Sequence, residues 1–393
     1  MRRLYTFILF SSLSLANALA QYGTGFVGNG YYRVHNFATD RYIYVTDNKD
    51  YYDESRDAED FQAIQLWKDA EKTISDPASV IYIRQYGDGS FNLQSQGTGV
   101  KELTGYTVKV DKKSNGTYEV SAKRGPVTKY LSDDRSNSNA QGVLGTSGTT
   151  KYRRWVVDKI ETNHATNYFG VKPTIEYNGK FYQPFFAAFP FKTASPDMHV
   201  YYINKVAGYQ ATLQEIDGVI PDSTAVIIEC ASANPSDNRL EILPPSKEKL
   251  SGNQLKGVYF CNGDRPDEST EAFTEYNATT MRLLTVSGGK LVLSNNAPER
   301  LQEIVHFDWD LYDDVNYTCI PANTCYMMAN AGTPDVLNIR FVGVGIDEIL
   351  AEKKNNEAVG VYTLSGTQLR ATNDVKGLPA GLYIVGGVKV AIK

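Results

Sequence analysis

Histidine, cysteine and tryptophan are scarce in this chain. Its 393 residues include four histidines, four cysteines and three tryptophans. The sequence has no CxxC pair and no HExxH motif, so the closely spaced ligands of a zinc site are missing. It also lacks a nucleophile elbow and a Walker loop. We therefore predict no catalytic residue, no zinc and no cofactor, although a serine triad or a Cys–His pair can still assemble from distant segments.

Long apolar runs are also missing, apart from one near the N-terminus. Arg2 and Arg3 precede an apolar run over residues 4–15, and a small-x-small site ends at Ala20. This order is typical of a secretory signal peptide, and the run is shorter than the roughly 18 residues of a membrane-spanning helix. We predict a signal peptide over 1–20, cleavage after Ala20, no transmembrane segment, and a protein that is secreted or held at the outer cell surface.

An excess of basic residues is absent as well. The chain carries 40 lysines and arginines against 45 acidic residues, a net charge of −5. Nucleic-acid binding needs a concentrated basic face, so nucleic acid is not an expected partner.

The cysteines are few but even in number, which permits disulfides in an exported chain, with three possible pairings. Cys319 and Cys325 flank a proline-containing turn, Ile-Pro-Ala-Asn-Thr. The two thiols can face each other across that turn, so we predict them as a candidate disulfide.

Aromatic residues are abundant, with 27 tyrosines and 16 phenylalanines, and they favour strands. The fold class predicted for the whole chain is all-β. In the N-terminal part, strand-like segments open at Tyr31, Val80 and Tyr118, and each reads as a β run, a polar turn and a second β run. Trp67 and Trp155 are 88 residues apart, twice 44, as in a threefold repeat.

This pattern resembles a β-trefoil, and Gln65-Leu66-Trp67 is similar to the Gln-x-Trp signature of ricin-type lectin repeats. The resemblance implies a β-trefoil-like domain over 21–160 that contacts sugars through an aromatic platform with nearby Asp or Asn side chains. The candidate ligand-binding residues are Tyr42, Tyr44, Asp47 and Asn48 in the first hairpin, and Tyr86, Asp88 and Asn92 in the second. The same residue types also form turns beside strands, which is the alternative interpretation.

The middle region, 161–342, contains an internal repeat. Val219–Ile228 aligns with Cys319–Met328, and Pro221 and Pro321 lie 100 residues apart. In each copy a proline sets a turn, a polar trio follows, and a β run begins at a threonine. We predict a β-sandwich region with a duplicated unit.

Acidic residues cluster in two places. Asp308, Asp310, Asp313 and Asp314 lie within seven positions, which suits a calcium site, a glycosidase carboxylate pair or a solvated loop. The stretch 47–60 carries seven acidic residues and reads as an exposed loop.

The C-terminal part, 343–393, reads as a linker followed by a small β module. Residues 346–356 are charged and can form one or two helical turns, and 359–364 reads as a strand. Residues 383–385 pair with 388–392 through Gly-Gly, a favoured hairpin turn. The opening Val-Tyr-x-Leu-Ser-Gly and the later Gly-Leu-Tyr resemble the C-terminal sorting module of type IX secretion in Bacteroidetes-type bacteria. The resemblance implies export machinery as a partner of the C-terminus.

These patterns predict an exported, non-catalytic binding protein that engages glycans or a host or matrix protein through the trefoil. Two alternatives stay open at this point. One is a secreted, glycan-directed hydrolase with an accessory lectin domain, and the other is a protease inhibitor.

Overall fold

The structure, a computed structural model, describes residues 23–45, 64–67, 70–97, 108–133, 141–145, 150–259, 274–308, 313–343, 360–364, 366–385 and 388–392. The predicted signal peptide and the predicted helical turns at 346–356 lie outside these ranges. Strands dominate, and the one α-helix that the ranges contain is the short α1 (Ala70–Ser75). The all-β fold class is therefore confirmed. None of the described helices is long and apolar enough to cross a membrane.

The N-terminal part forms a closed barrel. Six strands pair in a ring: β1 (Gly30–Asn36), β4 (Ile81–Gln85), β5 (Phe91–Ser95), β6 (Val108–Lys112), β7 (Tyr118–Arg124) and β10 (Trp155–Lys159), which returns to β1. Two hairpins extend from the ring: β2 (Tyr42–Val45) with β3 (Ile64–Trp67), and β8 (Val127–Asp133) with β9 (Gln141–Gly145). β3 also pairs with β9. A six-stranded ring with hairpins that pair with one another is the architecture of a β-trefoil.

Alternating residues of all six ring strands fill the barrel. Tyr32 and Val34 of β1 point inward with Val120 of β7 and Trp155 of β10, and all four are buried. The Trp155 indole Nε1 donates to the carbonyl of Leu131 at 3.0 Å, so its polar atom is satisfied inside the core. Alternating residues of the ring strands are thus buried in the barrel core, around a hydrogen-bonded tryptophan.

The trefoil units differ from the predicted spacing in one respect. The hairpin that opens at Val80 joins β4, the last ring strand of the first unit, to β5, the first ring strand of the second. Trp155 lies on a ring strand, whereas Trp67 lies on a hairpin strand. The spacing of the two tryptophans therefore does not measure the repeat.

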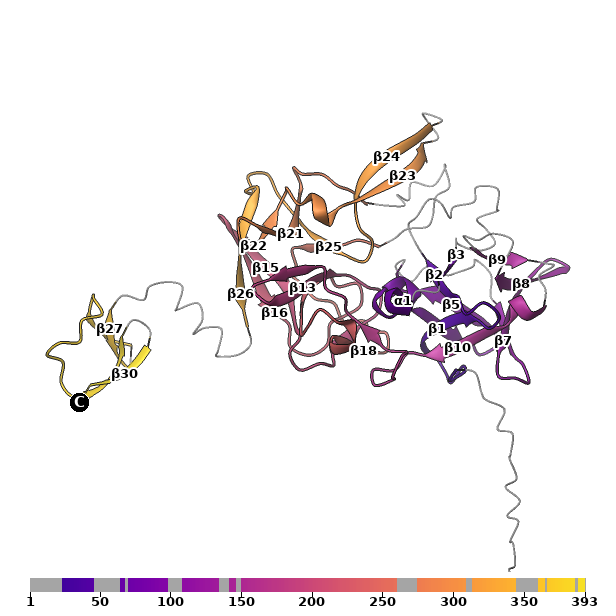
Figure 1. Ribbon diagram of the computed structural model, residues 1–393, viewed down its shortest axis with the longest axis horizontal. Coiled ribbons are helices and arrows are strands. Elements are labelled where there is room, and N and C mark those ends of the chain that lie inside the picture. The colour runs from indigo at the N-terminus through magenta and orange to yellow at the C-terminus, as the bar shows by residue number, and fades with distance from the viewer. Residues whose placement is uncertain are drawn as a thin grey trace, which may run out of the picture.

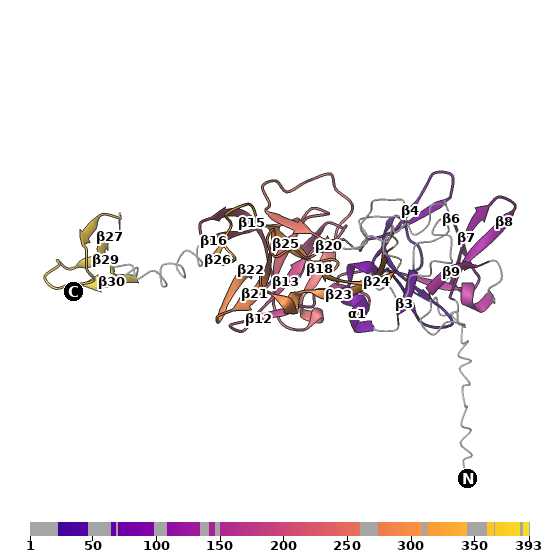
Figure 2. The same cartoon turned by 90° about the horizontal axis from the view of Figure 1, so that it is seen from above.

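The middle region is built on one ten-stranded sheet, and Figures 1 and 2 show it beside the barrel. In spatial order its strands are β12 (Ile175–Tyr177), β13 (Lys180–Phe185), β17 (Val226–Cys230), β15 (His199–Ala207), β16 (Gln210–Glu215), β26 (Val336–Val342), β22 (Lys290–Ser294), β21 (Met281–Ser287), β25 (Cys325–Met328) and β19 (Leu255–Gly257). The two ends of the sheet face each other across a shared core that draws residues from nearly every strand.

The strand order contains the duplication. The first copy supplies β13, β15, β16 and β17, and the second supplies β19, β21, β22 and β25, in the same chain order and with the same neighbours. β26 lies between the copies, parallel to β16 and antiparallel to β22.

The repeated turns have the same backbone. Ser223 and Asn323 both have positive φ, 55° and 59°. In the first copy the residue before the proline, Ile220, pairs with Phe191, and in the second Ile320 pairs with Thr274. The sequence echo therefore reflects one turn used twice.

A small sheet covers the outer face of each copy. The first is β11 (Phe169–Gly170), β18 (Arg239–Ile242) and β14 (Phe191–Thr193). The second is β20 (Thr274–Glu275), β24 (Asp313–Ile320) and β23 (Gln302–Asp308), whose last two strands form the long hairpin at the top of Figure 1. Each cover closes a separate hydrophobic cluster. The middle region is thus a layered β-sandwich.

The barrel and the first copy share a core. Tyr31 and Val80 of the barrel are buried in the same cluster as Phe169 and Phe189. Beside them the buried Arg33 guanidinium donates to the side chain of Asn167 at 2.8 Å and to the carbonyl of Tyr168 at 2.7 Å. The trefoil is therefore packed against the sandwich and also hydrogen-bonded to it.

The C-terminal part forms a four-stranded sheet, seen apart from the rest in Figure 1. Its order is β28 (Gln368–Arg370), β27 (Val361–Thr363), β29 (Gly381–Val385) and β30 (Val388–Ile392). Val385 pairs with Val388, so the predicted tight hairpin is present. The predicted strand over 359–364 corresponds to β27, and β28 was not predicted.

Candidate functional site

The predicted ligand-binding residues of the first hairpin are only partly described. Tyr42 lies on β2, where its ring stacks on His35 with centroids 4.9 Å apart, and burial raises the pKa of its hydroxyl. The side chain of Tyr44 is not described, and Asp47 and Asn48 lie outside the described ranges. The ring of Tyr42 is thus packed against β1 through His35, and the group predicted around it stays a prediction.

The second hairpin separates its three predicted residues. Asp88 accepts hydrogen bonds from the Ser90 backbone N–H at 2.9 Å and from its hydroxyl at 2.5 Å, so it holds the β4–β5 turn. Asn92 is buried on β5. Tyr86 is half-exposed, with the Arg84 guanidinium 5.2 Å from its ring centroid. Tyr86 therefore offers an aromatic ring at the surface, whereas Asp88 is used in the turn and Asn92 is buried.

Two further tyrosines of the trefoil repeat the arrangement of Tyr86. The Arg153 guanidinium lies 4.3 Å from the ring centroid of Tyr130, and the Lys151 ammonium lies 4.8 Å from that of Tyr152. Both rings are half-exposed. Sequence reasoning missed the Tyr130–Arg153 pair because β8 and the 3₁₀ turn η3 (Thr150–Arg153) meet only in the fold, whereas Lys151 and Tyr152 are neighbours within η3. Adjacent Lys-Tyr-Arg at 151–153 is the one signal that pointed there.

The acidic cluster lies at the tip of the β23–β24 hairpin. Asp308 and Asp313 are cross-strand partners, and Asp314 is the next residue on β24. Their side chains and the whole of Asp310 lie outside the described atoms. The calcium and glycosidase interpretations stay predictions. Among the side chains that are described, no three His, Cys, Asp or Glu residues come together as a metal site.

The predicted disulfide between Cys319 and Cys325 is wrong. Cys319 is the next-to-last residue of β24 in the small outer sheet, whereas Cys325 begins β25 in the ten-stranded sheet. The turn between them therefore carries the chain from one layer to another and does not fold it back as a hairpin. Neither cysteine forms a disulfide, and the Cys325 thiol lies 3.3 Å from the carbonyl of Val226, to which it donates.

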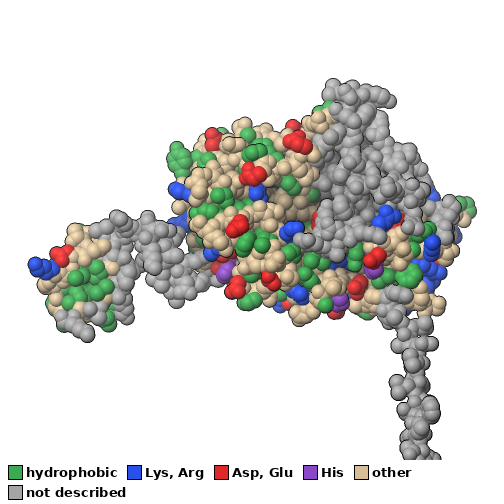
Figure 3. Space-filling view, viewed as in Figure 1, with side chains coloured by type: hydrophobic (Ala, Val, Ile, Leu, Met, Phe, Trp, Pro, Cys, Tyr) green, Lys and Arg blue, Asp and Glu red, His purple; other side chains and the backbone are tan. Residues whose placement is uncertain are grey.

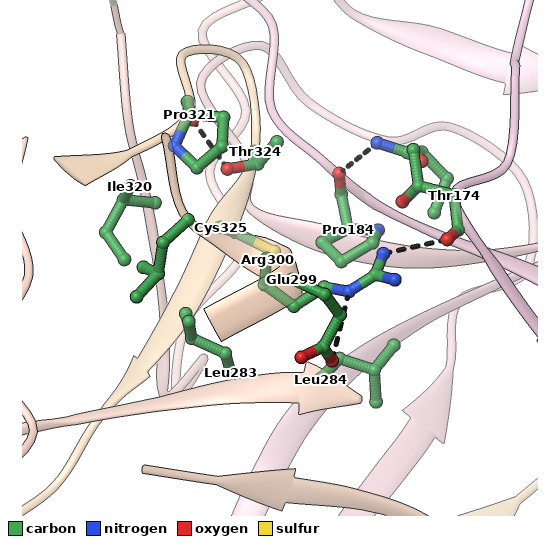
Figure 4. Close-up of a pocket in the computed structure, with 12 residues that line it drawn as sticks. Thr174, Pro184, Leu283, Leu284, Glu299, Arg300, Ile320, Pro321, Thr324 and Cys325 are labelled. Atoms are coloured by element: carbon green, nitrogen blue, oxygen red, sulfur yellow. Dashed lines mark hydrogen bonds and ion pairs between the residues drawn. The ribbon is translucent and has the colours of Figure 1, made fainter. Parts of the chain in front are cut away.

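A pocket of about 160 Å³ opens where the two copies of the sandwich meet, and Figure 4 shows its lining. Thr174, Gln183 and Pro184 come from the first copy. The remaining lining residues come from the second copy: Leu283, Leu284, Glu299, Arg300, Leu301, Ile320, Pro321, Thr324 and Cys325. Arg300 spans the boundary, because its Nη1 donates to the carbonyl of Thr174 at 2.8 Å.

The polar groups of this pocket are suited to binding. Arg300 Nε, 3.6 Å from a Glu299 carboxylate oxygen, and Gln183 Oε1 are buried and have no hydrogen-bond partner among the described residues. They offer one donor and one acceptor beside leucine and isoleucine walls. Burial acts to raise the pKa of Glu299, but hydrogen bonds from Thr285 and its own backbone, together with Arg300, outweigh burial and lower it. Glu299 is therefore an anion at neutral pH.

The same pocket lacks the parts of a nucleophilic site. Cys325 is its thiol, and burial raises the pKa of that thiol to about 12, so it is protonated at neutral pH. No histidine lines the pocket to act as a base. Sequence reasoning missed this pocket since its walls come from both copies. Gln183, a polar residue inside a run of aromatic residues, was the available signal.

No family model and no curated protein matches the sequence. Matching solved structures include Cry35Ab1, which is 14% identical over 43% of this chain with a TM-score of 0.26. Another is a mosquitocidal holotoxin, 11% identical over 78% of this chain with a TM-score of 0.27. This chain spans 47% of the first structure and 35% of the second. Superpositions this loose carry no argument about function.

Proposed function

We propose that the chain is an exported, non-catalytic binding protein that engages an extracellular glycan or protein through its trefoil, with glycan favoured. The observation that carries the proposal is the set of tyrosine–cation pairs on the trefoil, at Tyr86, Tyr130 and Tyr152. All three rings are half-exposed.

These pairs have the chemistry that sugar recognition requires. An aromatic ring offers a flat apolar surface, and a neighbouring guanidinium or ammonium offers several hydrogen-bond donors. The ring is rigid, so little conformational entropy is lost when a ligand orders it. A saccharide, with one apolar face and a rim of hydroxyls, matches both parts.

The pocket between the sandwich copies favours binding over hydrolysis. A hydrolase that uses no metal ion needs a nucleophile with a base, or two carboxyl groups about 5–10 Å apart. The described pocket has one carboxylate, Glu299, and a protonated thiol, Cys325. No feature of the described residues favours a protease inhibitor over a glycan-binding protein.

A glycan array probed with the chain from Gln21 onward tests the function. We expect binding to at least one glycan class, and a loss of that binding when Tyr86, Tyr130 and Tyr152 are changed together to Ala. Tyr209→Ala is the matched control, because this ring is 72% exposed but lies on the sandwich. Absence of glycan binding, or equal loss in the control, contradicts the glycan version of the proposal.

The export part of the proposal rests on the sequence of both ends. Deleting residues 343–393 is expected to abolish delivery to the surface or medium, measured by fractionation of the source cells. Deletion of 1–20 is the parallel variant and is expected to leave the protein in the cytoplasm. Unchanged delivery of the first variant contradicts a sorting role for the C-terminal sheet.

A further inference from the structure

Positive charge is concentrated in the third trefoil unit and the strand that precedes it. Residues 108–159 contain eleven lysines and arginines against five acidic residues, although the whole chain has 40 against 45. The rest of the chain therefore has 29 against 40. In Figure 3 lysine and arginine side chains gather at the end of the molecule where β7 and β8 lie. The acidic chain thus carries one local basic region.

Cross-strand pairing places two of these cations, Lys109 and Lys123, on one face. Ser121 of β7 pairs with Lys109 of β6 on one side and with Tyr130 of β8 on the other. Paired residues share a face, and Lys123, two positions after Ser121, shares it too. Val120 and Ala122 point into the barrel core, so this face is the outer one. We call it the basic face and define it by Lys109, Ser121, Lys123, Tyr130 and Arg153, whose guanidinium packs on Tyr130.

Most acidic groups near the basic face are already neutralised. Glu119 is paired with Lys113 at 2.5 Å and with Arg154 at 3.4 Å. Asp133 is buried and paired with Arg41. Asp111, two positions after Lys109 and the cross-strand partner of Glu119, lies on the same face, is exposed and has no ion pair among the described residues.

Two cations of the face, Lys109 and Lys123, differ from these acidic groups. Lys109 and Lys123 are exposed, and neither forms an ion pair with any residue that the structure describes. Like charges held on one face and left uncompensated create a positive potential that attracts a polyanion. The half-exposed ring of Tyr130 lies between them.

We propose that the basic face binds an anionic polysaccharide, one that bears sulfate or carboxylate groups along the chain. The inference rests on the proposed glycan-binding function and names its ligand class and its site. Lys109, Lys123 and Arg153 would contact the anionic groups, and Tyr130 would contact the apolar face of a sugar ring.

The dimensions of the face favour a polysaccharide over duplex nucleic acid. Three neighbouring strands span about 10 Å, since adjacent strands lie about 4.8 Å apart. One turn of duplex DNA extends about 34 Å. A few sugar units fit the face, whereas a duplex would extend well past it over the acidic remainder of the chain.

Heparin, polygalacturonate and dextran are the probes, as sulfated, carboxylated and neutral polysaccharides, with the chain from Gln21 onward on a biosensor. We expect binding to at least one anionic probe and none to dextran. The logarithm of the affinity should fall linearly with the logarithm of salt concentration, because each contact releases a counterion.

Two double variants with equal changes in net charge locate the site. Lys109→Glu with Lys123→Glu should weaken binding to the anionic probe on the order of tenfold or more, as each reversal turns an attraction into a repulsion. Lys205→Glu with Lys256→Glu, on exposed positions of the sandwich, should leave the affinity within about twofold. Asp111→Asn should strengthen binding about twofold, because it removes an exposed acid from the face itself.

The outcomes separate this inference from the function on which it rests. Binding to neutral glycans alone on the array overturns the anionic ligand but keeps the glycan-binding function. No binding to any glycan overturns both. Equal weakening by the two double variants overturns the basic face as the site, and tighter binding to a DNA duplex than to either anionic probe at the same salt concentration overturns the ligand class. Circular dichroism confirms that each variant is folded.

Discussion

The two copies in the sandwich share four strands and one turn, but their surroundings differ. The first copy is covered by β11, β18 and β14 and by the trefoil, through Tyr31 and Val80. The second is covered by β20, β24 and β23, and it has gained the long β23–β24 hairpin between β22 and β25. In the first copy the corresponding stretch between β16 and β17 contains no strand longer than a single bridge, at Ile220.

The shared turn shows what this difference does. In the first copy the Ser223 hydroxyl accepts a hydrogen bond from Tyr259 at 2.9 Å in an exposed position. In the second copy the Asn323 amide is buried and donates to Gly97 of the trefoil at 3.3 Å and to Phe186 of the first copy at 3.2 Å. The same backbone turn therefore lies at the surface in the first copy, whereas in the second copy it connects the trefoil with both copies of the sandwich.

Adding one methyl group where the two copies touch should cause the largest loss of stability. A Cβ on Gly257 of β19 would lie 2.1 Å from the ring of Phe186, a core residue of the first copy. Gly257→Ala should destabilise the protein by about 3 kcal/mol or more, the upper range for overpacking. Urea unfolding measures it. Gly87→Ala, where the added Cβ meets nothing within 4 Å, is the control and should change stability little. Equal stability of both variants would contradict a common core.

Removing the side chain of the repeated turn should have an intermediate effect that differs between the copies. Asn323→Gly leaves two buried carbonyls without their donor and should cost about 2 kcal/mol. Ser223→Gly removes one exposed hydrogen bond and should change stability by less than about 0.5 kcal/mol. Glycine relieves the positive φ at both sites, so the difference in unfolding free energy reports the amide itself. Equal losses of unfolding free energy in the two variants would mean that the Asn323 side chain does not stabilise the contact between the trefoil and the two copies.

Alkaline pH should lower the free energy of unfolding through one buried cysteine thiol in each copy. Burial raises the pKa of Cys230 in β17 and of Cys325 in β25 to about 12, with a smaller contribution from Glu229 at Cys230. The folded state holds these protons more tightly than the unfolded chain, whose thiols titrate near pH 8.5. The stability from each thiol is complete below that pH and is lost as the pH rises toward 12. Between pH 9 and 10 the loss should be about 1 kcal/mol per thiol.

Single alanine variants isolate this contribution. Cys230→Ala and Cys325→Ala should each flatten the fall of unfolding free energy with pH, whatever their effect at neutral pH. An unchanged slope in both variants would assign the alkaline instability to other groups.

Substitutions in the two small sheets that cover the copies should change stability least. Lys192 and Glu241 form an exposed cross-strand ion pair at 3.1 Å in the first cover, and Thr318 donates to Glu303 at 2.9 Å across the second. Lys192→Ala and Thr318→Ala should each cost no more than about 0.5 kcal/mol, because solvent screens exposed pairs. Thermal denaturation is sensitive enough to test this. A larger loss in one variant would show that its cover bears more of the stability than its exposure implies.

Local patterns predicted much of the fold, and long-range pairing limited the rest. Alternating residues and polar turns located the barrel hairpins, and the Ile-Pro-x-x-Thr echo located the duplication. Corresponding strands of the two copies are separated by different numbers of residues, in part because the second copy carries the β23–β24 hairpin, so the sequence repeat is visible only at the turns. The parallel pairing of β16 with β26, more than 120 residues apart, has no local signal.

The candidate site was less accessible to sequence reasoning. Tyr86 was foreseen because a turn next to a strand exposes its residues. Tyr130 acquires its cation, Arg153, from the approach of η3 to β8, which depends on how the barrel closes. Tyr152 and Lys151 are sequence neighbours within η3, and no strand pattern marked them. The predicted Cys319–Cys325 disulfide assumed that a proline turn reverses the chain within one sheet, whereas here it connects two layers.

The place of β26 affects the order in which the protein can fold. This strand is the last of the sandwich to be synthesised, and it fills the gap between β16 and β22. Until residues 336–342 have been made, each copy presents an open strand edge, which is where β proteins pair wrongly with one another. Closing the sheet also requires contacts between distant parts of the chain, which is slow. During synthesis the sandwich is therefore exposed to wrong strand pairing. This period ends only when the seven residues of β26 have been made and have paired.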